Sequence, residues 1–158
     1  MNNFKLLKIK TILFFSFWTA SLFAINLEIV GPCKKEPLVK INYEVLNIAL
    51  DSVGQVTIDI FDKYAIPYFG GKEIIKSIFD MPHGNTSIEI IGEGKYRIYG
   101  WCYMVDDFMP EENQGQVFFT SNENILTWFL GYSILNNGEW ESSCEFAYEV
   151  KPKVFCSQ

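Results

Sequence analysis

The sequence lacks an excess of positive charge. Its 158 residues carry 13 Lys and Arg against 19 Asp and Glu, which gives a formal net charge of −6. Nucleic acids and anionic membranes are bound through basic surfaces, so the composition argues against both as partners. The chain is nevertheless not disordered, because 49% of it is hydrophobic and it contains 14 Phe. Its length favours one domain with a modest core.

The sequence also lacks the motifs of common catalytic sites. Its single histidine, His83, lies in a Pro-His-Gly turn, and there is no Gly-x-Ser-x-Gly, phosphate-binding loop or His-Glu-x-x-His pattern. We therefore expect no catalytic residue, no cofactor and no metal ligand. The alternatives, a carboxylate-based hydrolase or a calcium site, depend on acidic residues between positions 106 and 112. Their spacing fits no EF-hand loop, and a solvated acidic loop is the favoured interpretation.

No apolar run is long enough to span a membrane. The longest, residues 12–24, has 13 residues, whereas a spanning helix needs about 20. Three lysines and no acid precede it, and a small residue, Ala24, ends it. This pattern predicts a signal peptide over residues 1–24, a single domain over residues 25–158 without a membrane span, and a secreted or periplasmic location. An uncleaved N-terminal anchor is the alternative.

Four cysteines follow the predicted signal: Cys33, Cys102, Cys144 and Cys156. An even number in an oxidising compartment is typical of disulfides, and the absence of a Cys-x-x-Cys pair disfavours zinc or redox chemistry. Three pairings are open. We favour Cys33 with Cys156, closing the ends of the domain, and Cys102 with Cys144. Each bridge would stabilise the fold by roughly 3–4 kcal/mol through the unfolded chain.

Hydrophobic periodicity predicts strands and one main helix. Residues 26–30 and 38–45 alternate as strands, and residues 52–66 carry a helical stripe with a capping box at Ser52 and Gln55. Residues 72–79 read as two helical turns. Further strands are expected over residues 88–91, 95–105, 125–135, 140–144 and 146–150, with a hairpin turn at Asn137-Gly138. The expectation is an α+β domain, a mixed sheet with the main helix packed on one face.

Two segments carry a resemblance to a known family. Gly100-Trp101-Cys102-Tyr103-Met104-Val105 and Leu126-Thr127-Trp128-Phe129 occur in the order and spacing of the exported domains of unknown function of family 4430. These are related to the C-terminal domain of transcobalamin and intrinsic factor, and the resemblance covers about residues 27–156. It implies a β-grasp-like fold, a sheet wrapped around one helix.

The same resemblance implies no cobalamin site. In the cobalamin carriers a large α-helical barrel supplies the other half of the site, and no such barrel fits in this chain. Many relatives also have a Val-Asn-Gly turn after the Trp strand, where this sequence has Val105-Asp106-Asp107. The resemblance therefore implies the fold for this chain but no cobalamin-binding residue.

Aromatic residues give the best indication of a binding site. Strand alternation places Trp101 and Tyr103 on one face of their strand, and Trp128 and Tyr132 on one face of theirs. If the strands are neighbours, the four rings line one platform for a ligand or partner. The alternative, which we favour, is that the rings form the core against the helix.

The function predicted from these observations is an exported, soluble, non-catalytic binding domain for an unidentified small ligand or partner. The alternative is a structural or protein-interaction module of the cell envelope without a small-molecule ligand.

Overall fold

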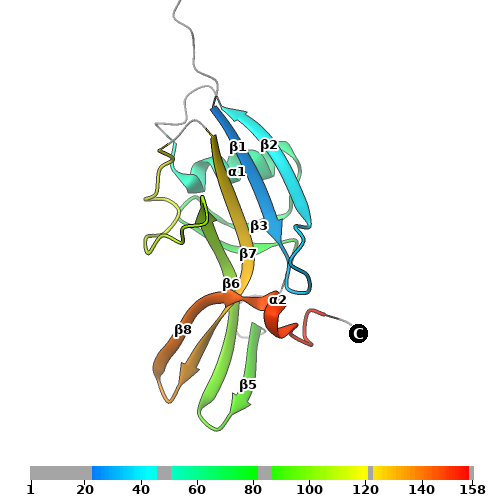
Figure 1. Cartoon of the computed structure of the whole chain (residues 1–158), viewed down its shortest axis with the longest axis vertical. Coiled ribbons are helices and arrows are strands. Elements are labelled where there is room, and N and C mark those ends of the chain that lie inside the picture. The colour runs from blue at the N-terminus through cyan, green and yellow to red at the C-terminus, as the bar shows by residue number, and fades with distance from the viewer. Residues whose placement is uncertain (1–22, 46–50, 82–86, 121–122, 157–158) are drawn as a thin grey trace, which may run out of the picture.

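The computed structural model describes residues 23–45, 51–81, 87–120 and 123–156 of the chain. Its elements follow the order β1 (Phe23–Val30), β2 (Val39–Val45), α1 (Val53–Lys63), β3 (Tyr68–Gly71), β4 (Ile74–Ile78), β5 (Ile88–Gly92), β6 (Lys95–Val105), β7 (Glu123–Asn136), β8 (Glu139–Phe146) and α2 (Ala147–Val150) (Figure 1). The expected mixed sheet with one main helix is confirmed. β1 begins two residues before the predicted mature N-terminus, so cleavage after Ala24 would remove the pairing of Phe23 with Val45.

A six-stranded sheet organises the molecule, in the order β2-β1-β7-β6-β5 with β8 also paired to β7. The long strand β7 has two neighbours in turn along one edge. Its first half pairs in parallel with β1 as far as Phe129, opposite Val30, and its second half pairs antiparallel with β8 from Gly131, opposite Phe146. Because β1 and β8 both end where β7 passes from one to the other, the sheet has an upper and a lower half (Figure 1).

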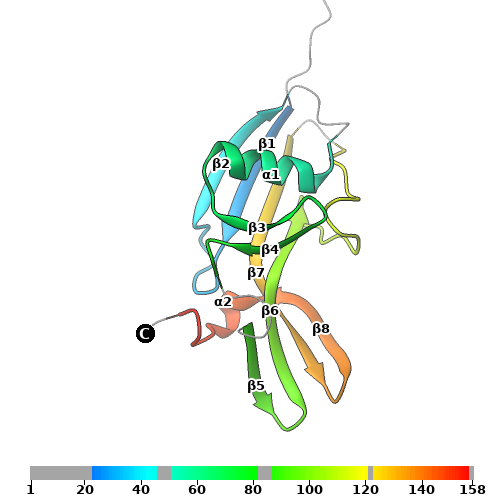
Figure 2. The ribbon, with the colours of Figure 1, turned by 180° about the vertical axis from the view of Figure 1, so that it is seen from behind.

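One face of the upper half is covered by α1 and the β3–β4 hairpin (Figure 2). The expected helix start is confirmed, since the Ser52 side chain accepts a hydrogen bond from the Gln55 backbone N–H at 3.2 Å. The apolar stripe of the helix is buried against alternate residues of the sheet. This core contains Val53, Val56, Ile60 and Phe61 from α1, Ile25, Leu27 and Ile29 from β1, and Leu126 and Trp128 from β7. We call the sheet face that carries these residues the helix-side face.

Two local predictions are wrong. Residues 72–79 are not helical, because burial alternates along β4, where Ile75 and Ser77 are buried and Lys76 between them is exposed. Residues 146–150 are not a strand, because β1 already occupies the edge of β7 next to Phe129. β8 therefore cannot continue past Phe146, and the chain turns into the short helix α2.

Both expected disulfides are present, Cys33–Cys156 and Cys102–Cys144, and no described cysteine is free. The first ties the loop after β1 to the C-terminal segment across 123 positions of sequence. The second joins β6 to β8 across β7, close to the place where β7 changes partner. The bridges therefore brace the junction between the two halves of the sheet.

Candidate functional site

The sequence-predicted aromatic platform lies on the helix-side face, and α1 covers part of it. Trp128 is 1% exposed and Tyr103 is 7% exposed, with ring centroids 5.5 Å apart. The Trp128 indole N–H donates to the Thr57 hydroxyl on α1 at 3.1 Å, and the Tyr103 hydroxyl donates to the Glu112 carbonyl at 2.7 Å. Burial raises the pKa of Tyr103 to about 12. These two rings are core residues with satisfied polar atoms.

The other two predicted residues, Trp101 and Tyr132, lie further along the same face and are only half-buried. They pack around Tyr99, Leu130 and Ala147, which form a separate small core below the helix. The structure therefore brings the four rings onto one face, with Tyr103 and Trp128 in the main core, Tyr132 against the second, and Trp101 packed against both. A ligand-binding role for Trp101 and Tyr132 stays a prediction, and these are the two rings with surface available for it.

A polar cluster adjoins this second core. The Glu89 carboxylate accepts hydrogen bonds from the Tyr99 hydroxyl at 2.7 Å and from the Arg97 guanidinium at 2.8 Å. The Arg97 guanidinium also lies over the Tyr132 ring, 5.0 Å from its centroid. The hydrogen bond from Tyr99 lowers the pKa of Glu89, while burial and then that same bond raise the pKa of Tyr99 to about 12. At neutral pH Glu89 is therefore ionised and Tyr99 is protonated, and the hydrogen bond between them stabilises the fold.

The candidate site is a groove of about 510 Å³ on the opposite, uncovered face, a size typical of small-molecule sites. It lies where β1 and β8 both end against β7. Sequence analysis did not find it, because it is assembled from five separate segments. Its lining residues are Glu28, Val30, Lys35, Glu36, Pro37, Met104, Asp107, Thr127, Phe146 and Tyr148.

The floor of the groove is largely apolar and belongs to the sheet. Val30 of β1 and Thr127 of β7 are 6% and 8% exposed, and both belong to the paired region of the sheet. Behind them, Phe129 packs against Phe146 with ring centroids 4.3 Å apart, and Phe146 packs against Tyr148 at 5.1 Å. Burial raises the pKa of Tyr148, so its hydroxyl stays protonated and able to donate a hydrogen bond.

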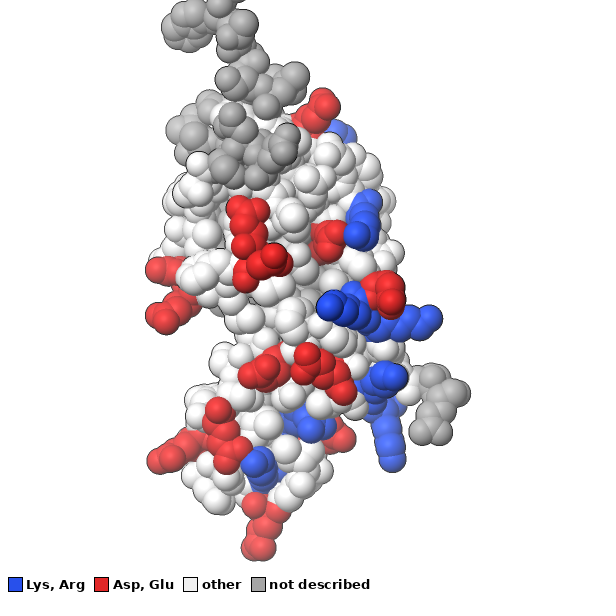
Figure 3. Space-filling view, viewed as in Figure 1, with Lys and Arg blue, Asp and Glu red and all other residues white. Residues whose placement is uncertain are grey.

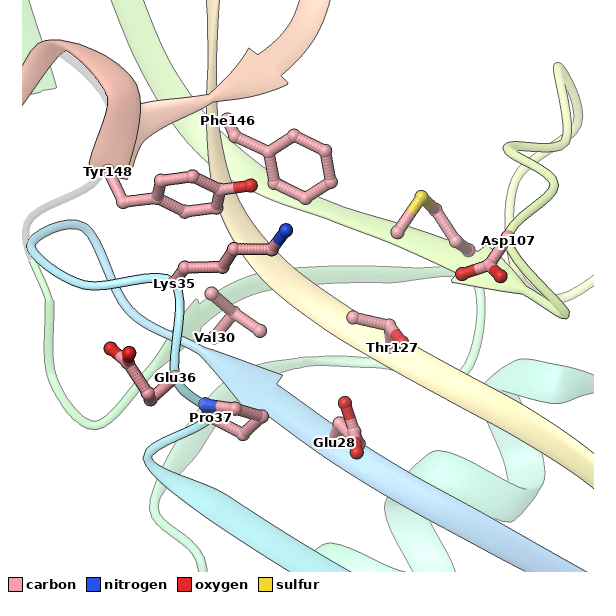
Figure 4. Close-up of a pocket in the computed structure, with 10 residues that line it drawn as sticks. Glu28, Val30, Lys35, Glu36, Pro37, Asp107, Thr127, Phe146 and Tyr148 are labelled. Atoms are coloured by element: carbon pink, nitrogen blue, oxygen red, sulfur yellow. The ribbon is translucent and has the colours of Figure 1, made fainter.

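Charged groups stand around this apolar floor. Figure 4 shows Lys35 and Tyr148 at one end, Asp107 at the other, and Thr127 and Glu28 between them. Glu28 also forms an ion pair with Lys40, whose ammonium donates a hydrogen bond to the Glu28 carboxylate at 2.7 Å. In the space-filling view, both signs of charge are scattered over this side of the molecule (Figure 3). The groove therefore offers an apolar surface bordered by Lys35 and by three carboxylates, Glu36 near Lys35, Glu28 along one side and Asp107 at the far end.

A disulfide holds one end of the groove and a tight turn holds the other. At one end, the loop that carries Lys35 is held by the Cys33–Cys156 disulfide. At the other, Asp106 and Asp107 both have positive φ, 50° and 62°, and close a tight turn between Val105 and Phe108. This is the geometry that an Asn-Gly pair adopts readily. Asp106 also accepts hydrogen bonds from the Ile125 N–H at 2.8 Å and the Asn124 amide at 2.9 Å.

The described residues hold no group of three or more His, Cys, Asp or Glu side chains placed to bind a metal ion. His83 falls outside the part of the chain that the structure describes. Within that part, no helix is long and apolar enough to cross a membrane.

No protein-family model matches this chain, and no curated protein matches it either. The site is therefore interpreted from its own geometry.

Proposed function

We propose that the protein is an exported, non-catalytic binding domain with a β-grasp-like fold, and that it holds a small ligand in the groove between β1, β7 and β8. The ligand has an apolar body that rests on Val30, Met104 and Phe146. An acidic group on it meets Lys35, and a basic or hydroxyl group at its far end meets Asp107. Such a ligand matches the charges and the apolar floor of the groove.

The groove itself is the observation that carries this proposal. The groove lies where β7 exchanges β1 for β8 as its neighbour. The ends of these two strands and two loops therefore converge on one place. The walls are held by both disulfides rather than by a helix packed on top. A braced, uncovered and largely apolar floor, with Lys35 and three carboxylates around it, supports binding better than catalysis.

Export is supported by the two disulfides, which persist in oxidising compartments. The relation to the exported domain family and to the transcobalamin C-terminal domain is part of the proposal. It is supported by the covering of one sheet face by α1. Corrinoids therefore belong among the ligands to be tried, although the groove has no counterpart to the helical barrel of the cobalamin carriers.

Calorimetric titration of a panel of small amphiphilic acids, amino acids and corrinoids tests the proposal. Replacing Lys35 or Tyr148 by Ala should weaken binding of any ligand found by at least about tenfold. The matched controls are Lys34→Ala, next to Lys35 on the same loop, and Tyr64→Ala, an exposed tyrosine on the opposite side of the sheet. Equal losses in variants and controls would contradict a site in the groove.

A second function, a protein-interaction module, is favoured by one specific observation. Large apolar side chains are exposed together on the lower half of the sheet, including Ile90 at 76% and Trp140 at 60%. Exposed apolar surface of this kind is typical of a partner interface.

A further inference from the structure

The lower half of the sheet, formed by β5, β6, β7 and β8, has an apolar row across all four strands. Ile90 pairs with Tyr96, Tyr96 with Leu135, and Leu135 with Trp140. Residues directly opposite in a sheet share a face, so these four side chains stand side by side. The adjacent row adds Ile88 opposite Ile98. We call these six residues the apolar patch.

The reverse face of the same four strands carries the small core around Tyr99 and Leu130 and, beyond it, charged pairs. Arg97 lies opposite Glu89 and forms an ion pair with it at 2.8 Å, and Lys95 forms one with Glu141 at 2.6 Å. Antiparallel sheets that are half solvated place polar residues in water and apolar residues against a covering layer. On the reverse face the apolar side chains are packed and the exposed ones form ion pairs, whereas the apolar patch has no such packing partner among the described residues.

The part of the chain that the structure describes does not cover it. Ile90 and Trp140 are 76% and 60% exposed, Ile88 is 43% exposed and Tyr96 is 37% exposed. These residues come from three strands, β5, β6 and β8, so the exposure belongs to a continuous surface rather than to scattered single residues.

The apolar patch and the groove point to opposite sides of the molecule. Followed along the strands, both lie on the same face of the sheet, the one opposite α1, as the strand registers require. Strands β6 and β7, however, exchange sides between the two halves, with β6 left of β7 above and right of it below (Figure 1). The sheet has thus turned over, and charged side chains face the viewer across the lower half (Figure 3). Covering the patch leaves the groove open.

We propose that the occupant of the apolar patch is a second copy of this chain, packed face to face on the same six residues. The six side chains expose on the order of 500 Å² in one copy, so two copies bury on the order of 1,000 Å², the least that a specific interface needs. A two-fold dimer uses the same surface twice, so the surface must fit itself.

The shape of the patch allows such a fit. Beside the protruding apolar row lies a hollow of about 190 Å³ over Gly100, Gly131 and Ser133. Gly100 has nothing within 4 Å of the place where a side chain would begin. An antiparallel two-fold arrangement sets the apolar row of each copy over the hollow of the other. This is the knob-and-hollow complementarity that an isologous interface requires.

Charge also favours a second copy over a membrane. The patch contains no charged residue, so two chains of net charge −6 meet through it without opposing like charges inside the contact. An anionic bilayer would instead repel the acidic chain as a whole.

Sedimentation of protein produced from the full-length sequence tests the dimer. The wild type should sediment at twice the chain mass over a concentration series, and Ile90→Glu should raise the dimer dissociation constant at least about tenfold. The matched control is Ile74→Glu, because Ile74 is a strand isoleucine of similar exposure, 54%, on the separate β3–β4 hairpin. Trp140→Glu repeats the test from the other edge of the patch, and circular dichroism verifies folding of each variant.

The outcomes separate this proposal from the groove. A dimer that Ile90→Glu and Trp140→Glu dissociate, and that Ile74→Glu leaves intact, supports it, and ligand affinity in the groove should then be unchanged. A wild-type monomer at every concentration overturns it, and so does a dimer that both patch variants leave intact. A monomer whose Trp140 fluorescence responds to lipid vesicles would replace the second copy by a membrane.

Discussion

At the scale of single residues, one buried hydroxyl on α1 pairs with the largest buried side chain of the sheet. Thr57, fully buried on α1, donates its hydroxyl proton to the Val53 carbonyl at 2.7 Å and accepts the indole N–H of Trp128 at 3.1 Å. One hydroxyl thus links the helix to the largest buried side chain of the sheet. The strand that contains Trp128 could be predicted from the sequence. Its hydrogen-bond partner, Thr57, could not, because it lies 71 positions away and local propensity carries no information about long-range pairing.

Replacing Thr57 by Val should lower the free energy of unfolding by about 1–3 kcal/mol, because the buried Trp128 N–H loses its acceptor. Urea denaturation measures the change. Thr57→Ser, which keeps the hydroxyl and removes only a methyl group, is the control and should lose less. Equal losses for the two variants would show that packing, not the hydrogen bond, is responsible.

The hydrogen bonds to the Glu89 carboxylate should make the stability of the fold depend on pH. The pKa of Glu89 is lowered in the folded state, chiefly by the hydrogen bond from Tyr99. Its stabilising contribution is therefore complete above its ordinary value of 4.5 and is lost as the pH falls through the lowered folded pKa. Glu89→Gln should flatten the stability profile below about pH 4.5. Denaturation midpoints across pH, with Glu93→Gln as the control, measure this, and parallel profiles would contradict it.

At the scale of elements, the sequence predicted those that have strong local signals. The strand at Lys95–Val105, the helix start at Ser52 and the Asn-Gly hairpin all follow from periodicity, capping and turn chemistry. The errors occur where tertiary competition decides. The residues after Phe146 alternate as a strand should, yet β1 already occupies the edge of β7 that they would need.

The turn between β7 and β8 gives an element-scale prediction. Asn137 and Gly138 both have positive φ, 50° and 90°, as a two-residue hairpin turn requires. Gly138→Ala should reduce stability by about 1 kcal/mol, because a side chain strains that backbone conformation. Gly71→Ala is the control, since open space surrounds its added Cβ and its φ is not in the left-handed region. Equal thermal-melting shifts for the two would contradict the turn assignment.

At the scale of the whole molecule, two disulfides brace the junction of the half-sheets, where the groove lies. The sequence predicted both pairings from the even cysteine count and the preference for long closed loops. It did not predict the groove. Its residues come from β1, the following loop, β6 with its turn, β7, and β8 with α2, and only the exchange of partners along β7 brings them together.

Removing the bridge between Cys33 and Cys156, with both residues changed to Ser, should lower stability by about 3–5 kcal/mol because it opens a long loop of the unfolded chain. It should also weaken ligand binding, because the loop with Lys35 loses its anchor. Removing the second bridge, Cys102–Cys144, is the comparison and should cost less, since its loop is shorter, 42 against 123 positions. Chemical denaturation under oxidising conditions measures both, and the reverse order would contradict the account.

A ligand bound in the groove between β1, β7 and β8 should perturb the residues that line it. The most direct measurement is a two-dimensional NMR titration of the protein with the panel that includes amphiphilic acids and corrinoids. Saturable shifts are expected at Val30, Lys35, Thr127 and Tyr148, with the amides around Trp101 and Tyr132 unmoved. Saturable shifts confined to Trp101 and Tyr132, or none in the groove with any member of the panel, would contradict it.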